Sequence, residues 1–232
     1  MPNETRLDLA IDNVKISYFI ANEIKKYYTK GIILIVTNPV DIITYKFTEW
    51  LELPAGIVFG TGCILDSSRM TNIIADYVGL RSDIVTANVI GEHGERQITL
   101  WSKVLIAGVP IAEYCEMTSL DFNTEKKKEI EEQVIKMGTS IIKGKGRTHY
   151  GIATCVCYIA DAILNRRPTI ASLCSTINGE YGVNDVALSL LSVVGANGIE
   201  RIITDKLSDS EYIKLKETET YLKEYLQKVK NF

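Results

Sequence analysis

The chain has 232 residues, of which 46% are hydrophobic and 24% are charged, and its net charge at pH 7 is −3. Such a length is enough for one large domain or two closely packed ones, with a sizeable core. The composition is that of a soluble globular protein, and the small negative charge gives no reason to expect nucleic acid or a membrane as partner. The three lysines at 126–128 are flanked by Glu125 and Glu129. They predict a solvated helix face rather than a polyanion site.

Five cysteines, an odd number, predict reduced thiols in a cytoplasmic protein. Cys155 and Cys157 could form half of a metal site, but no second pair follows and the two would point to different faces of a helix. We therefore expect core packing there and no metal. No stretch is long enough to span a membrane, and the polar, acidic start at residues 1–4 lacks the features of a signal peptide.

The first 90 residues alternate between helical and strand patterns. We expect helices at 7–28, 41–51 and 65–78, and strands at 32–36, 57–59 and 84–90. The strand at 32–36 is a continuous β-branched run, typical of a parallel strand covered on both faces. The β-α-β-α-β order predicts a parallel sheet with crossover helices.

From about residue 97 the pattern becomes that of an α+β domain. Short strands are expected at 98–101 and 104–106, helices at 125–143 and 151–164, and an antiparallel pair at 170–177 and 183–194 around a turn at 179–182. Ser208 and Glu211 form a capping box that predicts a last helix to about residue 230. These patterns predict two domains, residues 1–91 and 92–232.

One of only two histidines, His93, follows an apolar run and is flanked by Gly91 and Gly94. Asp66 and Arg69 are three residues apart on one predicted helix face. An imidazole, a carboxylate to orient it and a guanidinium to bind an anion would suit proton transfer on an acidic substrate. The alternative is a surface ion pair between Asp66 and Arg69 and a loop histidine without a role.

Four motifs, in this order and at these spacings, resemble the lactate/malate dehydrogenase family. They are Glu-Thr-Arg-Leu-Asp-Leu at 4–9, Thr-Asn-Pro-Val-Asp at 37–41, Leu-Asp-Ser-Ser-Arg at 65–69 and Gly-Glu-His-Gly-Glu at 91–95. The Glu-Thr-Arg form looks like a bacterial-type L-lactate dehydrogenase rather than a malate enzyme. The resemblance implies an NAD-dependent oxidoreductase that transfers a hydride between lactate and NAD. Malate or another L-2-hydroxy acid is the alternative substrate.

The resemblance also implies a role for each matching residue. His93 would be the acid/base, and Asp66 would hold its other ring nitrogen and raise the pKa of the imidazolium. Arg69 would bind the substrate carboxylate with a two-point contact, Arg6 would polarise the reacting carbonyl, and Asn38 would hydrogen-bond the substrate.

Further implied contacts concern the substrate methyl and the cofactor. Thr148 would line a small pocket beside the methyl group. Val36, Thr37, Asn38 and Thr61 would bind the nicotinamide side of NAD. The partners implied are a small 2-hydroxy or 2-oxo acid and further copies of the chain, in a dimer or a tetramer.

The family begins with a strand and a Gly-x-Gly-x-x-Gly turn that seats the pyrophosphate of NAD on a helix N-terminus. The 232 residues contain no such sequence. We therefore expect a truncated, doubly wound (Rossmann-type) parallel sheet followed by an α+β substrate domain. On this view the chain is a truncated gene product or one part of a split enzyme. The alternative is a non-catalytic remnant that pairs with a full-length relative.

Overall fold

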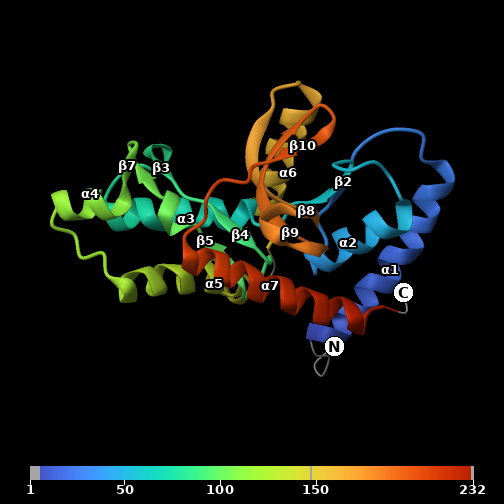
Figure 1. The fold of residues 1–232 in the computed structure, drawn as a ribbon, viewed down its shortest axis with the longest axis horizontal. Coiled ribbons are helices and arrows are strands. Elements are labelled where there is room, and N and C mark those ends of the chain that lie inside the picture. Colours follow the sequence, from blue (N-terminus) through green and yellow to red (C-terminus); the bar gives the residue numbers. More distant parts are fainter. Residues whose placement is uncertain (1–5, 147, 231–232) are drawn as a thin grey trace.

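The computed structural model describes residues 6–146 and 148–230 (Figure 1). The α-helices of these residues are α1 (Arg6–Tyr27), α2 (Val40–Leu51), α3 (Ile64–Val78), α4 (Ile111–Met117), α5 (Thr124–Lys145), α6 (Tyr150–Leu164) and α7 (Asp209–Lys228). The strands are β1 (Ile33–Ile35), β2 (Val58–Gly60), β3 (Val85–Thr86), β4 (Val89–Gly91), β5 (Gln97–Thr99), β6 (Leu105–Ile106), β7 (Val109–Pro110), β8 (Thr169–Asn178), β9 (Asn184–Gly195) and β10 (Gly198–Ile202). Short 3-10 helices are η1 (Ser82–Ile84), η2 (Trp101–Lys103) and η3 (Glu180–Gly182).

The first part of the chain forms a parallel β-α-β unit, as predicted. β1 pairs in parallel with β2, with Ile33 opposite Val58 and Ile35 opposite Gly60, and α2 connects them. In the described sheet β1 is the end strand. This position agrees with the expectation that the sheet begins at residues 32–36, and it confirms the Rossmann-type character of this part of the fold.

The prediction of a third parallel strand at 84–90 is wrong. This segment divides into η1, β3 and β4. β3 joins a small sheet with β6 and β7, whereas β4 pairs antiparallel with both β9 and β5. Side chains of α3 explain the division, because Thr71 Oγ1 donates to the Ala87 carbonyl and Ser67 Oγ accepts from the Val89 N–H. A continuous parallel ladder would need these backbone groups for a neighbouring strand.

The long hairpin of β8 and β9 confirms the predicted antiparallel pair and forms the centre of the main sheet. The strand order is β1-β2-β8-β9-β4-β5, with β10 paired to β9. The sequence patterns did not predict β10. Since strands from both sides of residue 92 share this sheet, no gap in the sheet marks a division there, and the boundary at residue 92 stays a prediction.

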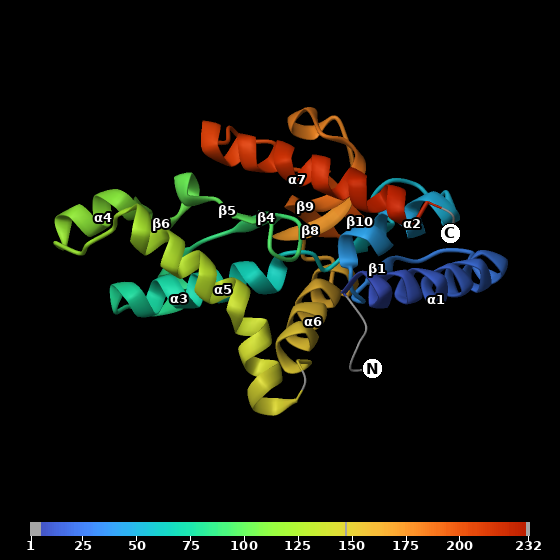
Figure 2. The same cartoon turned by 90° about the horizontal axis from the view of Figure 1, so that it is seen from below.

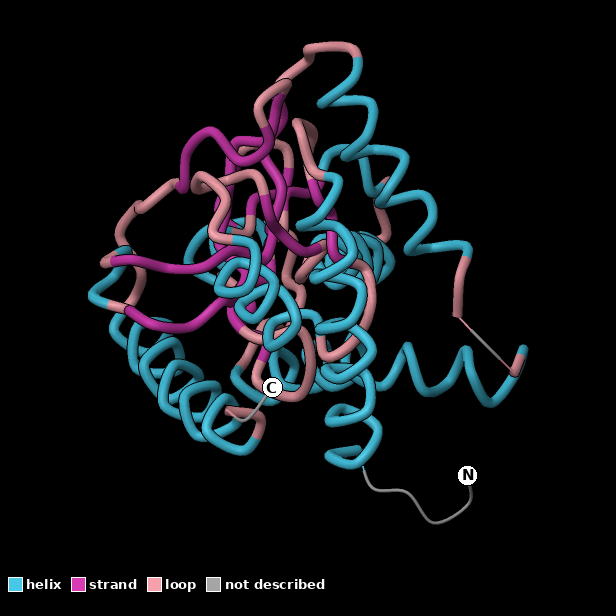
Figure 3. Tube along the Cα trace, turned by 90° about the vertical axis from the view of Figure 1, so that its right-hand side faces the viewer, coloured by secondary structure: helices cyan, strands magenta, loops and turns pink. Residues whose placement is uncertain are grey.

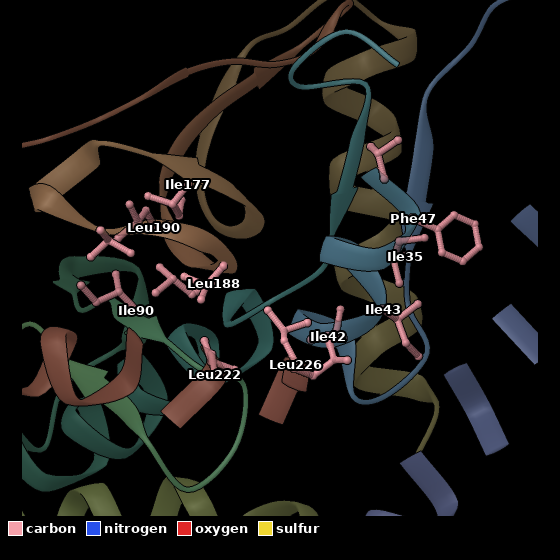
Figure 4. Close-up of a cluster of buried hydrophobic side chains, with 14 of the residues drawn as sticks. Ile35, Ile42, Ile43, Phe47, Ile90, Ile177, Leu188, Leu190, Leu222 and Leu226 are labelled. Atoms are coloured by element: carbon pink, nitrogen blue, oxygen red, sulfur yellow. The ribbon is translucent and has the colours of Figure 1, made fainter. Parts of the chain in front are cut away.

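The main hydrophobic core lies between this sheet and the helices α2 and α7. Figure 4 shows Ile42 of α2 beside Leu226 of α7, Ile43 near Ile35 and Ile90 near Leu188, all within one cluster. α5 runs beside α3 (Figure 2), where a second core cluster lies. Figure 3 shows the strands gathered together with helices on both sides of them.

The capping box that opens α7 is present as predicted. Ser208 Oγ accepts from the Glu211 N–H, and the Glu211 carboxylate accepts from the Ser208 N–H. Cys155 is buried and Cys157 exposed on α6, so the two do point to different faces of the helix. The expected core packing is therefore right for Cys155 and wrong for Cys157. No helix in the described part of the chain has the length and apolar character needed to cross a membrane.

Candidate active site

His93 lies in the loop that follows β4, and two features fix the position of its backbone. Gly91, at the end of β4, has φ +89°, a conformation that glycine adopts without strain. The His93 N–H then donates to Asp41 Oδ2 at 2.9 Å, across 52 residues of sequence. A tight turn and a buried acceptor therefore set the position of the histidine.

Asp66 and Arg69, on the first turns of α3, meet His93 as predicted. His93 Nδ1 lies 2.6 Å from Asp66 Oδ2, and Arg69 NH1 lies 3.2 Å from Asp66 Oδ1. Since an ionised carboxylate can only accept, Nδ1 carries the proton of this hydrogen bond and Nε2 is the ring nitrogen left for a substrate. The alternative of a surface ion pair is wrong, because the Asp66 side chain is only 4% exposed and that of Arg69 13%.

Burial and charge act in opposite directions on the histidine. Burial lowers the pKa of the His93 imidazolium, but the hydrogen bond and the charge of Asp66 outweigh it and raise that pKa above its ordinary value. Asp41 raises it further, and Arg69 opposes the rise. A histidine with a raised pKa can hold a proton near neutral pH and release it to a substrate, as an acid/base group must.

The start of α3 is anchored to the centre of the sheet. Ser189 Oγ, on β9, accepts from the Cys63 N–H at 3.1 Å, just before the helix begins. Across the sheet, Gly60 lies opposite Cys174, Cys174 opposite Ser189, and Ser189 opposite Gly91. One line of paired residues therefore connects the strand before Asp66 with the strand before His93.

The side chains of Asp66, Arg69 and His93 line a cavity of about 580 Å³. Of the residues proposed from the sequence, the cavity is lined by Val36, Asn38, Thr61, Asp66, Arg69, His93 and Thr148. Thr37 is exposed next to Val36 and is not part of this lining. Arg6 begins α1, but its side chain lies outside what the structure describes, as do Glu4 and Thr5 of the first motif.

The sequence did not single out two residues of this region. In the sequence Asp41 is only the last residue of the motif at 37–41, and its buried contact with the His93 backbone joins positions that no spacing rule connects. Gln97, on β5, also lines the cavity, and its buried Nε2 has no hydrogen-bond partner among the described residues. A glutamine four residues after a histidine carries no recognisable signal.

Cys63, Asp66 and His93 each place one potential metal-ligand atom within 4.8 Å of the others. His93 Nδ1 and Asp66 Oδ2 are already hydrogen-bonded to each other. Burial also raises the pKa of the Cys63 thiol well above its usual range, which disfavours the thiolate that would bind a metal. The donor set therefore suits a histidine–aspartate pair better than a metal centre.

The chain is similar to several L-lactate dehydrogenases. An L-lactate dehydrogenase of Thermoanaerobacterium saccharolyticum is 40% identical over 228 residues, which are 98% of this chain and 73% of that protein. One of Acetivibrio thermocellus is 37% identical over 97% of this chain and 71% of its own length. The ligand-bound crystal structure of the minor L-lactate dehydrogenase from Enterococcus mundtii, 32% identical, superposes with a TM-score of 0.93 over 99% of this chain and 73% of its own.

Two family models also match. Residues 1–60 match the NAD binding domain of lactate/malate dehydrogenase, and residues 63–232 match its alpha/beta C-terminal domain. The chain belongs to the lactate/malate dehydrogenase family. Within that family it is an oxidoreductase of the L-lactate dehydrogenase type, with NAD as the cofactor.

The cavity fits the nicotinamide end of NAD. Val36, Leu65 and Ile152 give it apolar surface, and Val36 is 41% exposed although its side chain is hydrophobic. Asn38 and Thr61 add polar groups. Nicotinamide is a flat ring with a carboxamide, so a half-apolar wall with a few polar groups is chemically suited to it.

Proposed function

We propose that the cavity around His93 is the site at which an L-2-hydroxy acid exchanges its hydroxyl proton during lactate oxidation and pyruvate reduction. The observation that carries this proposal is the 2.6 Å contact of His93 Nδ1 with Asp66, with Arg69 on the other oxygen of the same carboxylate. It leaves His93 Nε2 and further N–H groups of Arg69 for a small anion in the same cavity.

The chemistry divides among the residues as follows. In lactate oxidation His93 Nε2 takes the proton of the 2-hydroxyl group, and in pyruvate reduction it returns a proton to the 2-oxo oxygen. Arg69 binds the substrate carboxylate through paired N–H groups, and Asn38 hydrogen-bonds the substrate oxygen. NAD, when bound, accepts or supplies the hydride. Arg6 polarises the reacting carbonyl, and Thr148 lies beside the methyl group.

Val36, Thr37, Asn38 and Thr61 are the residues we propose for the nicotinamide end of the cofactor. Val36, Asn38 and Thr61 have the support of lining the cavity, whereas Thr37 rests on its place in the motif. Because the 232 residues carry no Gly-x-Gly-x-x-Gly sequence, they offer NAD no phosphate cradle of that kind. We expect weak NADH binding by these residues alone, and fluorescence titration with NADH measures it.

Substrate choice is tested by comparing 2-oxo acids. A form of the protein that carries a Gly-rich segment in cis should show a higher kcat/KM for pyruvate than for oxaloacetate or branched 2-oxo acids. Thr148, Ile152 and Ile135 favour a small uncharged side chain, because they carry no charge. The lysine in the same lining, Lys136, is paired with Glu132 at 2.8 Å. A preference for oxaloacetate would instead assign the site to malate.

We further propose that the chain assembles as a homo-oligomer, a dimer or a tetramer, in the cytoplasm. Large hydrophobic side chains lie exposed on two helices, with Phe19 and Tyr27 on α1 and Tyr150 and Leu164 on α6. On α1, Ile16 and Ile20 are exposed at helical spacing beside Phe19, and a contiguous apolar face of this kind is typical of an interface. The five cysteines are unpaired, as expected for a reducing compartment. Light scattering of the purified chain gives its oligomeric state.

A further inference from the structure

A second carboxylate, that of Asp41, contacts the backbone of His93, and the reaction proposed above gives it no role. Asp41 lies in the first turn of α2 and is 3% exposed. Its Oδ2 accepts the His93 N–H at 2.9 Å. Its Oδ1 is buried, and the thiol of Cys174 on β8 also interacts with this carboxylate. A buried aspartate of this kind lowers the stability of the folded protein, because burial disfavours its charged form.

The surroundings of Asp41 identify the group that interacts with it. Burial raises the pKa of Asp41 to about 7, and the hydrogen bond from the His93 backbone and the charge of the His93 ring both lower it. The same charge interaction raises the pKa of His93. The titratable and charged groups that act on this pair are Asp66 and Arg69 of α3, Glu92 of the loop, Cys63 before α3, and Cys174 of β8.

We propose that Asp41 is a positioning residue for the reaction, which fixes the backbone of His93 and, as a second buried carboxylate, stabilises the imidazolium that forms when the ring takes the substrate proton. Asp66 holds the ring by its Nδ1, and Asp41 holds the main chain that carries the ring. The charge of the imidazolium lowers the pKa of Asp41 and so favours its ionised form. With both carboxylates ionised, the imidazolium has two anions beside it and a fixed position. This inference rests on the proposed acid/base role of His93.

The test is the titration of His93 by NMR, which needs no turnover. The chain has only two histidines, so the ring signals of His93 and His149 can be assigned with a His149→Gln variant. Asp41→Asn removes the charge but keeps an oxygen for the His93 N–H. Losing a nearby anion disfavours the imidazolium, so the pKa of His93 should fall by about 1 unit while that of His149 stays the same. Asp83→Asn is the matched control, since Asp83 is an exposed partner of Arg81 and should change neither value.

An unchanged pKa of His93 in Asp41→Asn would overturn the proposal. If that variant does not fold, Asp41→Ser also removes the charge and offers a hydroxyl oxygen to the same N–H. The unmodified chain gives a further test, because the His93 amide proton should be protected from exchange with solvent, and rapid exchange would contradict its bond to Asp41. If the form that carries a Gly-rich segment in cis is inactive while the titration is as expected, the proposed function fails and the coupling of Asp41 to His93 stands.

Discussion

Asp66 connects the two groups that give the cavity its chemistry. One of its oxygens holds His93 Nδ1 at 2.6 Å, and the other holds Arg69 NH1 at 3.2 Å. A single buried carboxylate therefore fixes the tautomer of the imidazole and the position of the guanidinium at once. Loss of its charge should affect the proton step first, because the imidazolium depends on it for stabilisation.

Replacement of Asp66 by Asn should shift the pH dependence of pyruvate reduction. The pKa of His93 is raised in the folded protein, so the protonated ring needed for reduction persists below that raised value and is lost as the pH rises through it. Without the carboxylate this loss should come at lower pH. The measurement is the pH profile of kcat/KM for pyruvate in a form that carries a Gly-rich segment in cis. An identical profile in Asp66→Asn would show that this pair does not set the proton affinity.

Replacement of Arg69 by Lys should mainly raise the KM for pyruvate. Lysine keeps the positive charge but loses the planar two-point contact with a carboxylate, so substrate binding weakens by at least about tenfold. Steady-state kinetics measure this change. Arg81→Lys is the control, because the Arg81 side chain is 87% exposed and far from the cavity lining. An unaltered KM would place the substrate carboxylate elsewhere.

At the scale of the elements, α7 is attached to the central hairpin through one buried carboxylate. Glu219 Oε1 accepts from the Asn184 N–H at the start of β9 and from Lys223 Nζ, and Oε2 accepts from Lys216. Burial raises the pKa of Glu219, but these hydrogen bonds outweigh it and lower the pKa from 4.5 to about 2. The ionised form therefore stabilises the contact of the helix with the sheet.

Glu219→Gln should lower the free energy of unfolding at neutral pH. A carboxylate whose pKa is lower in the folded state adds stability above its unfolded value near 4.5, and this stability is lost as the pH falls toward about 2. The difference between parent and variant should thus shrink below pH 4.5. Urea denaturation at several pH values measures it, with Glu217→Gln, on the exposed side of the same helix, as control. A difference that is constant across this range would contradict the assigned role.

The β8–β9 hairpin and the α-helices other than α4 could be predicted because their signals are local. Ser208 and Glu211 mark a helix start by themselves, and Gly79 ends α3 in the left-handed conformation that its residue type favours. The pairing of β4 could not be predicted. An apolar run shows that a strand is buried, but it does not identify the neighbouring strand. Ser67 and Thr71 divide the segment at 84–90 through hydrogen bonds from α3, a helix that is distant in the sequence.

On the scale of the whole molecule, the site is assembled from segments far apart in the chain. Asn38, Asp66, His93 and Thr148 line one cavity. Residue types and pattern already favoured a shared site for Asp66 and His93, and the resemblance to a known family added Thr148 to it. Periodicity placed His93 at the end of a parallel strand, whereas β4 runs antiparallel to its neighbours. The predicted strand direction is therefore wrong, and the role of His93 stays a proposal. Asp41 was missed because a contact between a side chain and a distant backbone N–H leaves no pattern in the sequence.

The most direct test of the proposed site is pyruvate-dependent loss of NADH absorbance, measured for three proteins. They are the 232-residue chain, the chain with a Gly-rich segment in cis, and the latter with His93→Asn. We predict little turnover by the 232 residues alone, turnover when the segment is present, and a loss of at least ~100-fold on His93→Asn, because a general acid/base contributes about that much. Equal turnover with and without His93 would contradict the assignment of the cavity as the proton-transfer site.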